Sequence, residues 1–456
     1  MLMAAGASAQ ALIRVAERVQ ASHKRGKTFA RANLFSRLSS HEPAMQQVLK
    51  KGSMLQLDKT ARATLRKERP EALTLRLPYD DGSTLTLELV RNQVLAPDFK
   101  VTTAAPDPTL TAYNSDLYYQ GIVTDTKGRS LAVISVVGNE VVGVLDVEGQ
   151  GNFVLGALDK DKKGRYAFFR SDDLQMPATA GCEADKLAPI AGQTTEQISQ
   201  QALDPNRCVR IYFECEYNMF QTRGSTVQGT VDYMTAVYNV VKTLYDNEQV
   251  NTAISEIFVW NTPDSYPTGI ISDALNGFRT ARANNFNGDV AHLVSMGAPS
   301  GSGVAYINVL CNKSYSFAYS YTYNSFSQFP TYSRPVEVLT HERGHNQGSP
   351  HTHACQWVVD GNGSATEMID GCGPNRGYTE GSCTVAPLPT NGRTIISYCH
   401  LVSGVGINFN NGFGTLPGNL IRSRVYNASC LTACNTCSTT VAISKNDVSG
   451  FVQLEL

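Results

Sequence analysis

The sequence contains no hydrophobic run of the roughly 20 residues that a membrane-spanning helix needs, so no transmembrane segment is expected. Charge is also scarce, because only 17% of the 456 residues are charged, the formal net charge is -1 and the pI is near 6.7. These values give no indication of a nucleic-acid partner or an anionic membrane partner. Internal repeats are absent as well. A chain of this length and composition, 42% hydrophobic, is expected to fold into two or three domains.

The first 72 residues have an uneven charge. Residues 1 to 70 hold 14 Lys and Arg against 4 Asp and Glu, and residues 10 to 69 show no long strand pattern. We interpret residues 1–72 as a basic leader that is helical or disordered, with an interaction arm as the alternative. The opening MLMAAGASAQA resembles the end of a secretory signal, with Ala7 and Ala9 placed for cleavage. A positive n-region and a full apolar segment are missing from it.

Two different patterns follow the leader. From Leu73 to about residue 170, apolar residues alternate with polar ones in short segments that end at Gly or Asp, and this predicts an antiparallel β domain. The stretch 171–205 is rich in Ala, Gln, Thr and Pro and is expected to be an exposed, cleavable linker. From 206 to 437 strand patterns alternate with helix patterns, which predicts an α/β domain with a mainly parallel sheet. Residues 438–456 read as the start of a further β segment. The predicted fold class is therefore mixed α/β, with an antiparallel β domain in front.

Ten of the eleven cysteines lie between Cys208 and Cys437, and only Cys182 lies outside. An even number in one domain predicts five disulfides and therefore a secreted, extracellular protein. The pair Cys434 and Cys437 has the spacing of a zinc ribbon, but no second CxxC completes four ligands, so disulfides are the expected state of this pair.

The strongest motif is HERGHNQGSPH, residues 341 to 351. On a helix, positions four apart share a face, so His341 and His345 can hold one ion with Glu342 beside them. Gly348 permits the turn that ends the helix, and the chain returns so that His351 supplies a third nitrogen. Three neutral imidazoles leave a fourth position for water, which is typical of a single catalytic Zn2+. Glu342 is then the candidate general base. His353 has the wrong spacing for the motif and is interpreted as an ordinary polar residue.

With this motif the chain resembles the metzincin zinc metalloendopeptidases, closest to the adamalysin (reprolysin) family and its bacterial relatives. The resemblance covers about residues 206 to 434, and the preceding β domain is similar to that family's propeptides. It implies a zinc cleft between an upper half-domain and a disulfide-rich lower one. It also implies a Met-turn beneath the zinc, which falls on TIISYC with Ile396 at the position of the methionine. Polypeptide substrates are implied to lie along an edge strand that includes Gly303, Val304, Ala305 and Tyr306.

Tyr398 follows Ile396 by two residues. In the related astacins and serralysins a tyrosine at this offset reaches the zinc or the oxyanion, which makes Tyr398 a candidate catalytic residue. The alternative is a packed aromatic side chain.

Arg343 and Gln347 depart from the family, because they fall on the helix stripe defined by Val336 and Leu339, where apolar residues are usual. A buried, unpaired guanidinium would cost several kcal/mol, although its long stem can reach solvent. Together with Ile396 these departures keep a second hypothesis open, a catalytically impaired zinc-binding protein that acts as a secreted binding module. The chain keeps all three histidines and Glu342, which favours an active endopeptidase.

Cys182 is the cysteine left over once ten are assigned to disulfides, and it lies in the linker just before the α/β domain. A thiolate is a good zinc ligand and could occupy the water position, so we predict that Cys182 holds the precursor latent. The prodomain is then the chain's own inhibitor. The family uses such a cysteine switch, but ATAGCEAD does not match its usual flanking residues. Cleavage within residues 186 to 206 is expected to release the prodomain and open the site.

Overall fold

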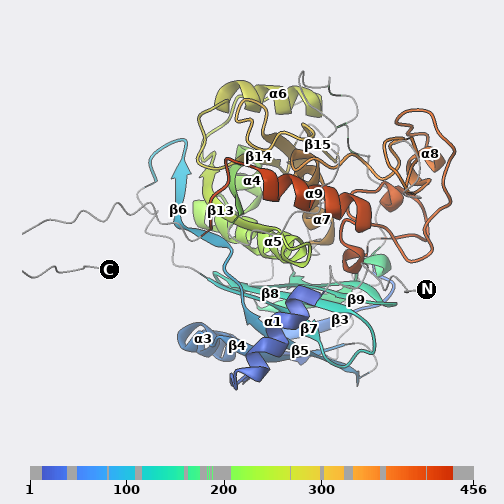
Figure 1. Cartoon of the computed structure of the whole chain (residues 1–456). Coiled ribbons are helices and arrows are strands. Elements are labelled where there is room, and N and C mark those ends of the chain that lie inside the picture. The colour runs from blue at the N-terminus through green and yellow to red at the C-terminus, as the bar shows by residue number, and fades with distance from the viewer. Residues whose placement is uncertain are drawn as a thin grey trace, which may run out of the picture.

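A computed structural model describes residues 13–38, 49–79, 82–107, 116–158, 163–174, 182, 184, 187, 207–267, 269–297, 302–322, 332–359, 366–406 and 408–434. The described residues form a ten-stranded and a six-stranded β sheet, and helix α5 (Val227–Asn247) lies between the two sheets (Figure 1). The predicted segment 438–456 and the signal-like Ala7 and Ala9 lie outside the described residues. Within the described part of the chain, no helix has both the length and the apolar character that crossing a membrane requires.

The larger sheet belongs to what we call the N-terminal β unit, the described residues from 13 to 174, of whose strands β6 alone lies in the other sheet. Its strand order is β1-β4-β5-β7-β8-β9-β10-β11-β3-β2, and every neighbouring pair is antiparallel except β1 and β4. Its elements are α1 (Ile13–Lys24), β1 (Ala30–Ala32), β2 (Phe35–Arg37), β3 (Ser53–Leu57), α3 (Lys59–Glu68), β4 (Ala72–Pro78), β5 (Thr84–Arg91), β7 (Leu117–Val123), β8 (Ser130–Val137), β9 (Glu140–Val147), β10 (Gly151–Ala157), β11 (Arg165–Arg170) and the 3-10 turn η3 (Ser171–Asp173).

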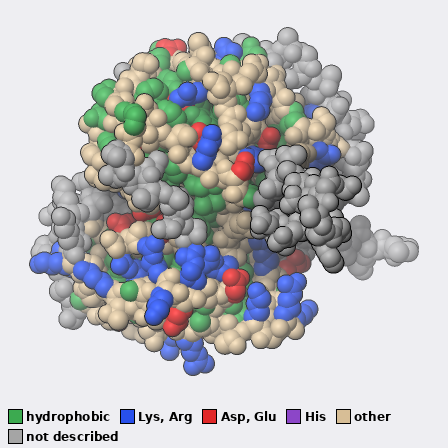
Figure 2. All heavy atoms as spheres, turned by 90° about the vertical axis from the view of Figure 1, so that its left-hand side faces the viewer, with side chains coloured by type: hydrophobic (Ala, Val, Ile, Leu, Met, Phe, Trp, Pro, Cys, Tyr) green, Lys and Arg blue, Asp and Glu red, His purple; other side chains and the backbone are tan. Residues whose placement is uncertain are grey.

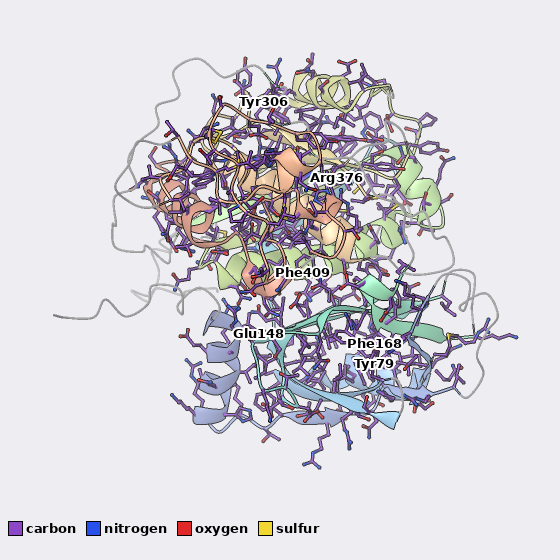
Figure 3. The ribbon with its side chains drawn as sticks, turned by 90° about the vertical axis from the view of Figure 1, so that its right-hand side faces the viewer. Tyr79, Glu148, Phe168, Tyr306, Arg376 and Phe409 are labelled. Carbon is purple, nitrogen blue, oxygen red and sulfur yellow. A yellow bond between two sulfur atoms is a disulfide. The ribbon has the colours of Figure 1, made fainter. Side chains whose placement is uncertain are left out.

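This sheet curls on itself. The ring of Tyr79, just after β4, lies 5.2 Å from that of Phe153 in β10 and 5.4 Å from that of Phe168 in β11, although these strands are far apart in the strand order. Figure 3 shows Tyr79 and Phe168 side by side in the N-terminal β unit. The side chains that point into the curl form one core, and those on the outer face form another with α5. Both faces of the sheet are therefore buried.

The six-stranded sheet belongs to what we call the C-terminal α/β unit, the described residues from 207 to 434. Its order is β15-β16-β14-β12-β13-β6, and its pairs are parallel except β15 with β16. Its elements are β12 (Cys208–Cys215), α4 (Tyr217–Thr222), α5, β13 (Asn251–Val259), α6 (Ile271–Arg282), β14 (Val290–Ser295), β15 (Gly303–Ala305), β16 (Phe317–Tyr321), α7 (Ser333–Asn346), α8 (Cys372–Asn375), η5 (Cys399–Leu401), η6 (Phe409–Asn411) and α9 (Thr415–Asn427). The predicted parallel order of the sheet is confirmed.

Strand β6 (Leu95–Thr103) comes from the N-terminal part of the sequence but pairs in parallel with β13, at the edge of the second sheet. Figure 1 shows it rising from the lower sheet to the upper one. The sequence pattern placed residues 73–170 in a single β domain, and this is wrong for β6. The strand is half exposed and contains Pro97, features that suit an edge position but do not reveal which sheet it joins.

The sequence interpretation of residues 10–69 as loose helix or disorder is also wrong for three strands, because β1, β2 and β3 lie in the predicted leader. Each spans only three to five residues, too few for a clear alternating pattern. Figure 2 shows Lys and Arg side chains gathered over the N-terminal β unit, to which the described part of the leader belongs.

Four disulfides are formed among the described cysteines: Cys208–Cys434, Cys311–Cys430, Cys355–Cys383 and Cys372–Cys399. The prediction of five is wrong, because Cys215 is unpaired and buried at the end of β12. The Cys215 side chain lies in the hydrophobic core that β12 shares with α5, whereas Cys208, at the other end of the same strand, pairs with Cys434. Cys437 lies outside the described residues.

Candidate metal centre

Helix α7 carries the first part of the motif, and His341, Glu342 and His345 lie on it one helical turn apart or less. The helix ends at Asn346, and Gly348 has φ +106°, a left-handed conformation that an L side chain rarely adopts. The predicted turn at Gly348 is therefore confirmed. It brings His351 back toward the helix, so that the Nε2 atoms of the three histidines lie 3.1 Å from one another.

Each imidazole is held by its other nitrogen. Nδ1 of His341 donates to the carbonyl of Ile395 at 2.8 Å, and Nδ1 of His345 donates to the carbonyl of Ser349 at 2.7 Å. Nδ1 of His351 donates to the Glu380 carboxylate. These bonds fix the tautomers, since a neutral ring with its hydrogen on Nδ1 presents a lone pair at Nε2. Three lone pairs therefore converge on one point.

The convergence suits a zinc ion. Lone pairs at 3.1 Å repel one another unless a cation lies between them, and Zn–N bonds of about 2.0–2.1 Å in tetrahedral geometry place two nitrogens roughly 3.3 Å apart. Burial, followed by the neighbouring imidazoles, holds the pKa of His341 well below its usual value and lowers the pKa of His345 to about 3. Both rings are therefore neutral at ordinary pH, as ligation requires. The residues present fit the metal.

The fourth member of the cluster is Cys182. Its Sγ lies 3.6 Å from Nε2 of His345, and the ligand atoms of Cys182 and the three histidines all lie within 4.8 Å of one another. The Cys182 thiol also donates to Oε2 of Glu342 at 3.3 Å. Burial raises the pKa of both groups, and the charge of Glu342 raises that of Cys182 further. A cation among the imidazoles would favour the thiolate instead.

Tyr398 lies beside the cluster and contacts both Cys182 and His351. It is fully buried, its hydroxyl donates to the backbone carbonyl of Cys182, and its ring centre lies 4.6 Å from that of His351. Ile396, two residues earlier, is buried against α7 where Gly344 leaves room, because a Cβ on Gly344 would lie 3.1 Å from Cδ1 of Ile396. The turn that carries the expected Met-turn position therefore lies against the helix of the motif.

Strand β15 is the antiparallel edge of the six-stranded sheet and lies beside Glu342. A Cβ on Gly303 would overlap with the Glu342 carboxyl group, so only glycine permits this approach. The expected edge strand included Tyr306, but β15 (Gly303–Ala305) ends one residue earlier. Asn308 and Cys311 have positive φ values of 57° and 69°, and this turns the chain away soon after Tyr306.

Sequence reasoning missed Glu380. Besides binding His351, its Oε1 lies 3.0 Å from Nε2 of His353, and the rings of His351 and His353 stack at 5.0 Å. Although burial raises the pKa of Glu380, the two imidazoles hold it far below its usual value. No local pattern could have identified this carboxylate, because 29 positions separate it from His351.

Arg343 and Gln347 are both fully buried, so the guanidinium does not reach solvent. The guanidinium carbon lies 5.5 Å from the ring centre of Tyr238 and 5.0 Å from that of Tyr245. None of its nitrogens has a hydrogen-bond partner among the described residues, and neither amide atom of Gln347 has one. The stripe faces the core, as its spacing predicted.

The comparison with known families agrees with this geometry. Residues 205–401 match the family described as Reprolysin_5, metallo-peptidase family M12. The match includes α7 and all three histidines of the cluster. No curated protein matches the chain.

Proposed function

We propose that the protein is a secreted, zinc-dependent endopeptidase made as a latent precursor, and the match of residues 205–401 to metallo-peptidase family M12 supports this. The observation that supports this most directly is the convergence of three neutral imidazole nitrogens at 3.1 Å beside a buried carboxyl group. The four disulfides support secretion, because such bonds persist in oxidising compartments.

His341, His345 and His351 would hold the zinc ion, and their Nδ1 bonds keep the rings oriented toward it. When bound, the ion supplies Lewis acidity, which makes an attacking water more acidic and polarises the scissile carbonyl.

Glu342 is the proton carrier in this proposal. It takes a proton from the attacking water and gives it to the leaving amine, the two-way proton role for which a carboxylate beside the metal is suited. Its Oε1 is buried and has no hydrogen-bond partner among the described residues, so it is available to a water molecule or a substrate.

Two further groups act on the substrate. An extended polypeptide would pair with the outer edge of β15, which no other described strand covers, and the close approach of Gly303 to Glu342 would bring its scissile bond to the proton carrier. The Tyr398 hydroxyl, which donates to a carbonyl oxygen of Cys182 in the latent chain, would donate to the developing oxyanion once that carbonyl has left.

Latency would come from Cys182. Its sulfur occupies the side of the histidine cluster that faces Glu342, where the attacking water must lie. In this proposal the N-terminal β unit is the prodomain, and the segment that carries Cys182 connects it to the α/β unit.

The test is metal analysis together with a digest of an unbiased peptide library, using protein cut at engineered sites on both sides of Cys182. We expect one zinc per chain and cleavage that disappears in Glu342→Gln while the zinc is retained. A chain that binds zinc without cleaving any peptide, even after Cys182→Ala, would support the impaired binding module instead. A chain that binds no zinc would exclude both.

A further inference from the structure

The outer face of the ten-stranded sheet is apolar and covered. Along β8, Leu131, Val133 and Val137 belong to the core that includes α5, while Ala132, Ile134 and Val136 point into the curl. The same division holds along β9, β10 and β11, where the residues of the outer core are Val142, Val144, Val154, Ala167 and Phe169. Strands that are apolar on both faces need a cover on both. The N-terminal β unit alone would expose this outer face to water.

Helix α5 covers that face, and it is itself buried nearly all round. Eighteen of its 21 residues are buried, whereas a surface helix leaves one face in water. Among the residues that face the sheet, Asn239 has specific partners. Its Nδ2 donates to the carbonyls of Tyr119 and Ile134 at 3.3 Å each and to Oγ of Ser135 at 3.0 Å, and its Oδ1 accepts from Asn92 at 2.8 Å. These bonds exist only while the two units are together.

Further contacts join the units. β6 hydrogen-bonds along β13 as the outermost strand of the second sheet. Arg18 in α1 forms an ion pair with Asp246 in α5 at 3.2 Å. Asp146 in β9 accepts from the backbone N–H of Phe409 at 2.9 Å and from the Asn410 side chain. Figure 3 shows Phe409 at the junction of the two units.

From these contacts we propose that the N-terminal β unit stays docked after the linker is cut, as a non-covalent subunit that completes the second sheet and covers α5. Its departure would expose an apolar sheet face, leave the edge of β13 unpaired and remove every partner of the Asn239 amide. The partner that binds the surface formed by β13 and α5 is therefore the chain's own N-terminal β unit.

Docking determines what one cut can do. Leu174 is held by a β-bridge to Leu49. Cys182 follows Leu174 by eight residues, so both lie on the N-terminal side of any cut made after residue 187. A cut between residues 188 and 206 leaves Cys182 tethered to a subunit that is still bound, at a high effective concentration near the histidines. Opening the site therefore needs a second cut, between Leu174 and Cys182.

The first experiment replaces residues 190–197 with the recognition sequence of a specific protease, in the full chain carrying Glu342→Gln. Because this chain is inactive by design, the result is independent of the proposed peptidase activity. After complete cutting, we expect both fragments to elute together from a gel-filtration column and to separate only in denaturant. Separate elution in native buffer would overturn the proposal.

A matched pair of variants tests the surface itself. Asn239→Asp places a carboxylate against the carbonyls of Tyr119 and Ile134, so the cut fragments should dissociate at least tenfold faster. Asn285→Asp makes the same chemical change at an exposed position after α6 and should leave dissociation unchanged. Equal dissociation in the two variants would show that this face of α5 does not hold the subunit.

Cobalt in place of zinc reports whether Cys182 still binds the metal after a cut. A thiolate ligand adds a charge-transfer absorption that three imidazoles do not produce. We expect this absorption in the uncut chain, its persistence after the single cut, and its loss after a second engineered cut within residues 175–181. The Cys182→Ala chain should lack it throughout. Loss of the absorption after the first cut alone would refute the claim that the docked unit keeps Cys182 at the metal. If the metal does not bind at all, the proposed function fails, while the gel-filtration result stands.

Discussion

The sulfur of Cys182 lies 3.6 Å from Nε2 of His345, although 163 positions of sequence separate the two residues. The same sulfur contacts the Glu342 carboxyl group at 3.3 Å. One side chain therefore contacts both a candidate metal ligand and the candidate base.

Replacing Cys182 with Ala in the uncut precursor should produce peptidase activity, because no sulfur then competes for the water position. The measurement is cleavage of an unstructured polypeptide before any processing, with the uncut parent as the silent control. Equal silence in both chains would contradict the switch and leave steric blocking by the N-terminal β unit as the explanation.

Replacing Glu342 with Gln should remove most turnover and keep the metal. Proton transfer by a positioned side chain contributes roughly 10²–10⁴-fold to a rate, so a loss of that size is expected in kcat. Glu148→Gln, at an exposed carboxylate of the N-terminal β unit, serves as the control. Full activity in Glu342→Gln would show that the mechanism proposed above is wrong.

Replacing Glu380 with Gln should weaken zinc binding by about 10–100-fold, because the carboxylate that orients His351 is lost while the side chain keeps its shape. Competition with a chelator measures the affinity directly. Glu367→Gln, a nearby carboxylate that accepts from the backbone of Val359, should leave the affinity unchanged. An unaltered affinity in Glu380→Gln would mean that packing alone orients His351.

Asp146 should make the stability of the docked protein depend on pH. Burial, with a further contribution from Asp172, raises the pKa of Asp146 to about 7, although bonds from Phe409 and Asn410 oppose the rise. The folded state then binds a proton that the unfolded state has released, so stability falls as the pH rises from about 4 to about 7. Each unit of pKa difference corresponds to about 1.4 kcal/mol.

Denaturant midpoints across this pH range test the role of Asp146. Asp146→Asn should flatten the dependence, since its amide can still accept from Phe409 and can donate to Asn410. Asp125→Asn, at an exposed residue of the same unit, should not change the slope. An unchanged slope in Asp146→Asn would place the titrating group elsewhere.

Arg343→Met should stabilise the C-terminal α/β unit. The buried guanidinium lacks a hydrogen-bond partner among the described residues, and replacing such a charge with an apolar side chain often gains about 1–4 kcal/mol. Two cation–π contacts oppose this gain by up to about 2 kcal/mol, so a small net gain in the unfolding free energy is expected.

Gln347→Met should act in the same direction, because both buried amide atoms are unpaired among the described residues. Arg376→Met, at an exposed position, is the control and should change stability by less than about 0.5 kcal/mol. A fall in the denaturant midpoint for Arg343→Met would mean that the two tyrosine rings compensate fully for burial of the charge.

The sequence by itself determined the features that depend on neighbouring residues. The 3.6-residue period puts His341 and His345 on one face of a helix, and Gly348 permits the turn that brings His351 back. Alternation identified β4 and β5, and short apolar segments bounded by Gly or Asp identified β7 to β10. Alternating strands and helices identified the parallel sheet. These patterns report local geometry, which the sequence encodes directly.

Only the tertiary structure decided the features that depend on distant segments. The partner of the His351 ring, the unpaired state of Cys215 and the transfer of β6 to the second sheet each bring together positions that no periodicity connects. Local patterns also show whether a strand is apolar on both faces, as β8 and β9 are, but not what covers it. Here α5 covers the sheet, because packing the two apolar surfaces against each other removes both from water. One hydrophobic core therefore joins two parts of the chain that the sequence presents as separate domains.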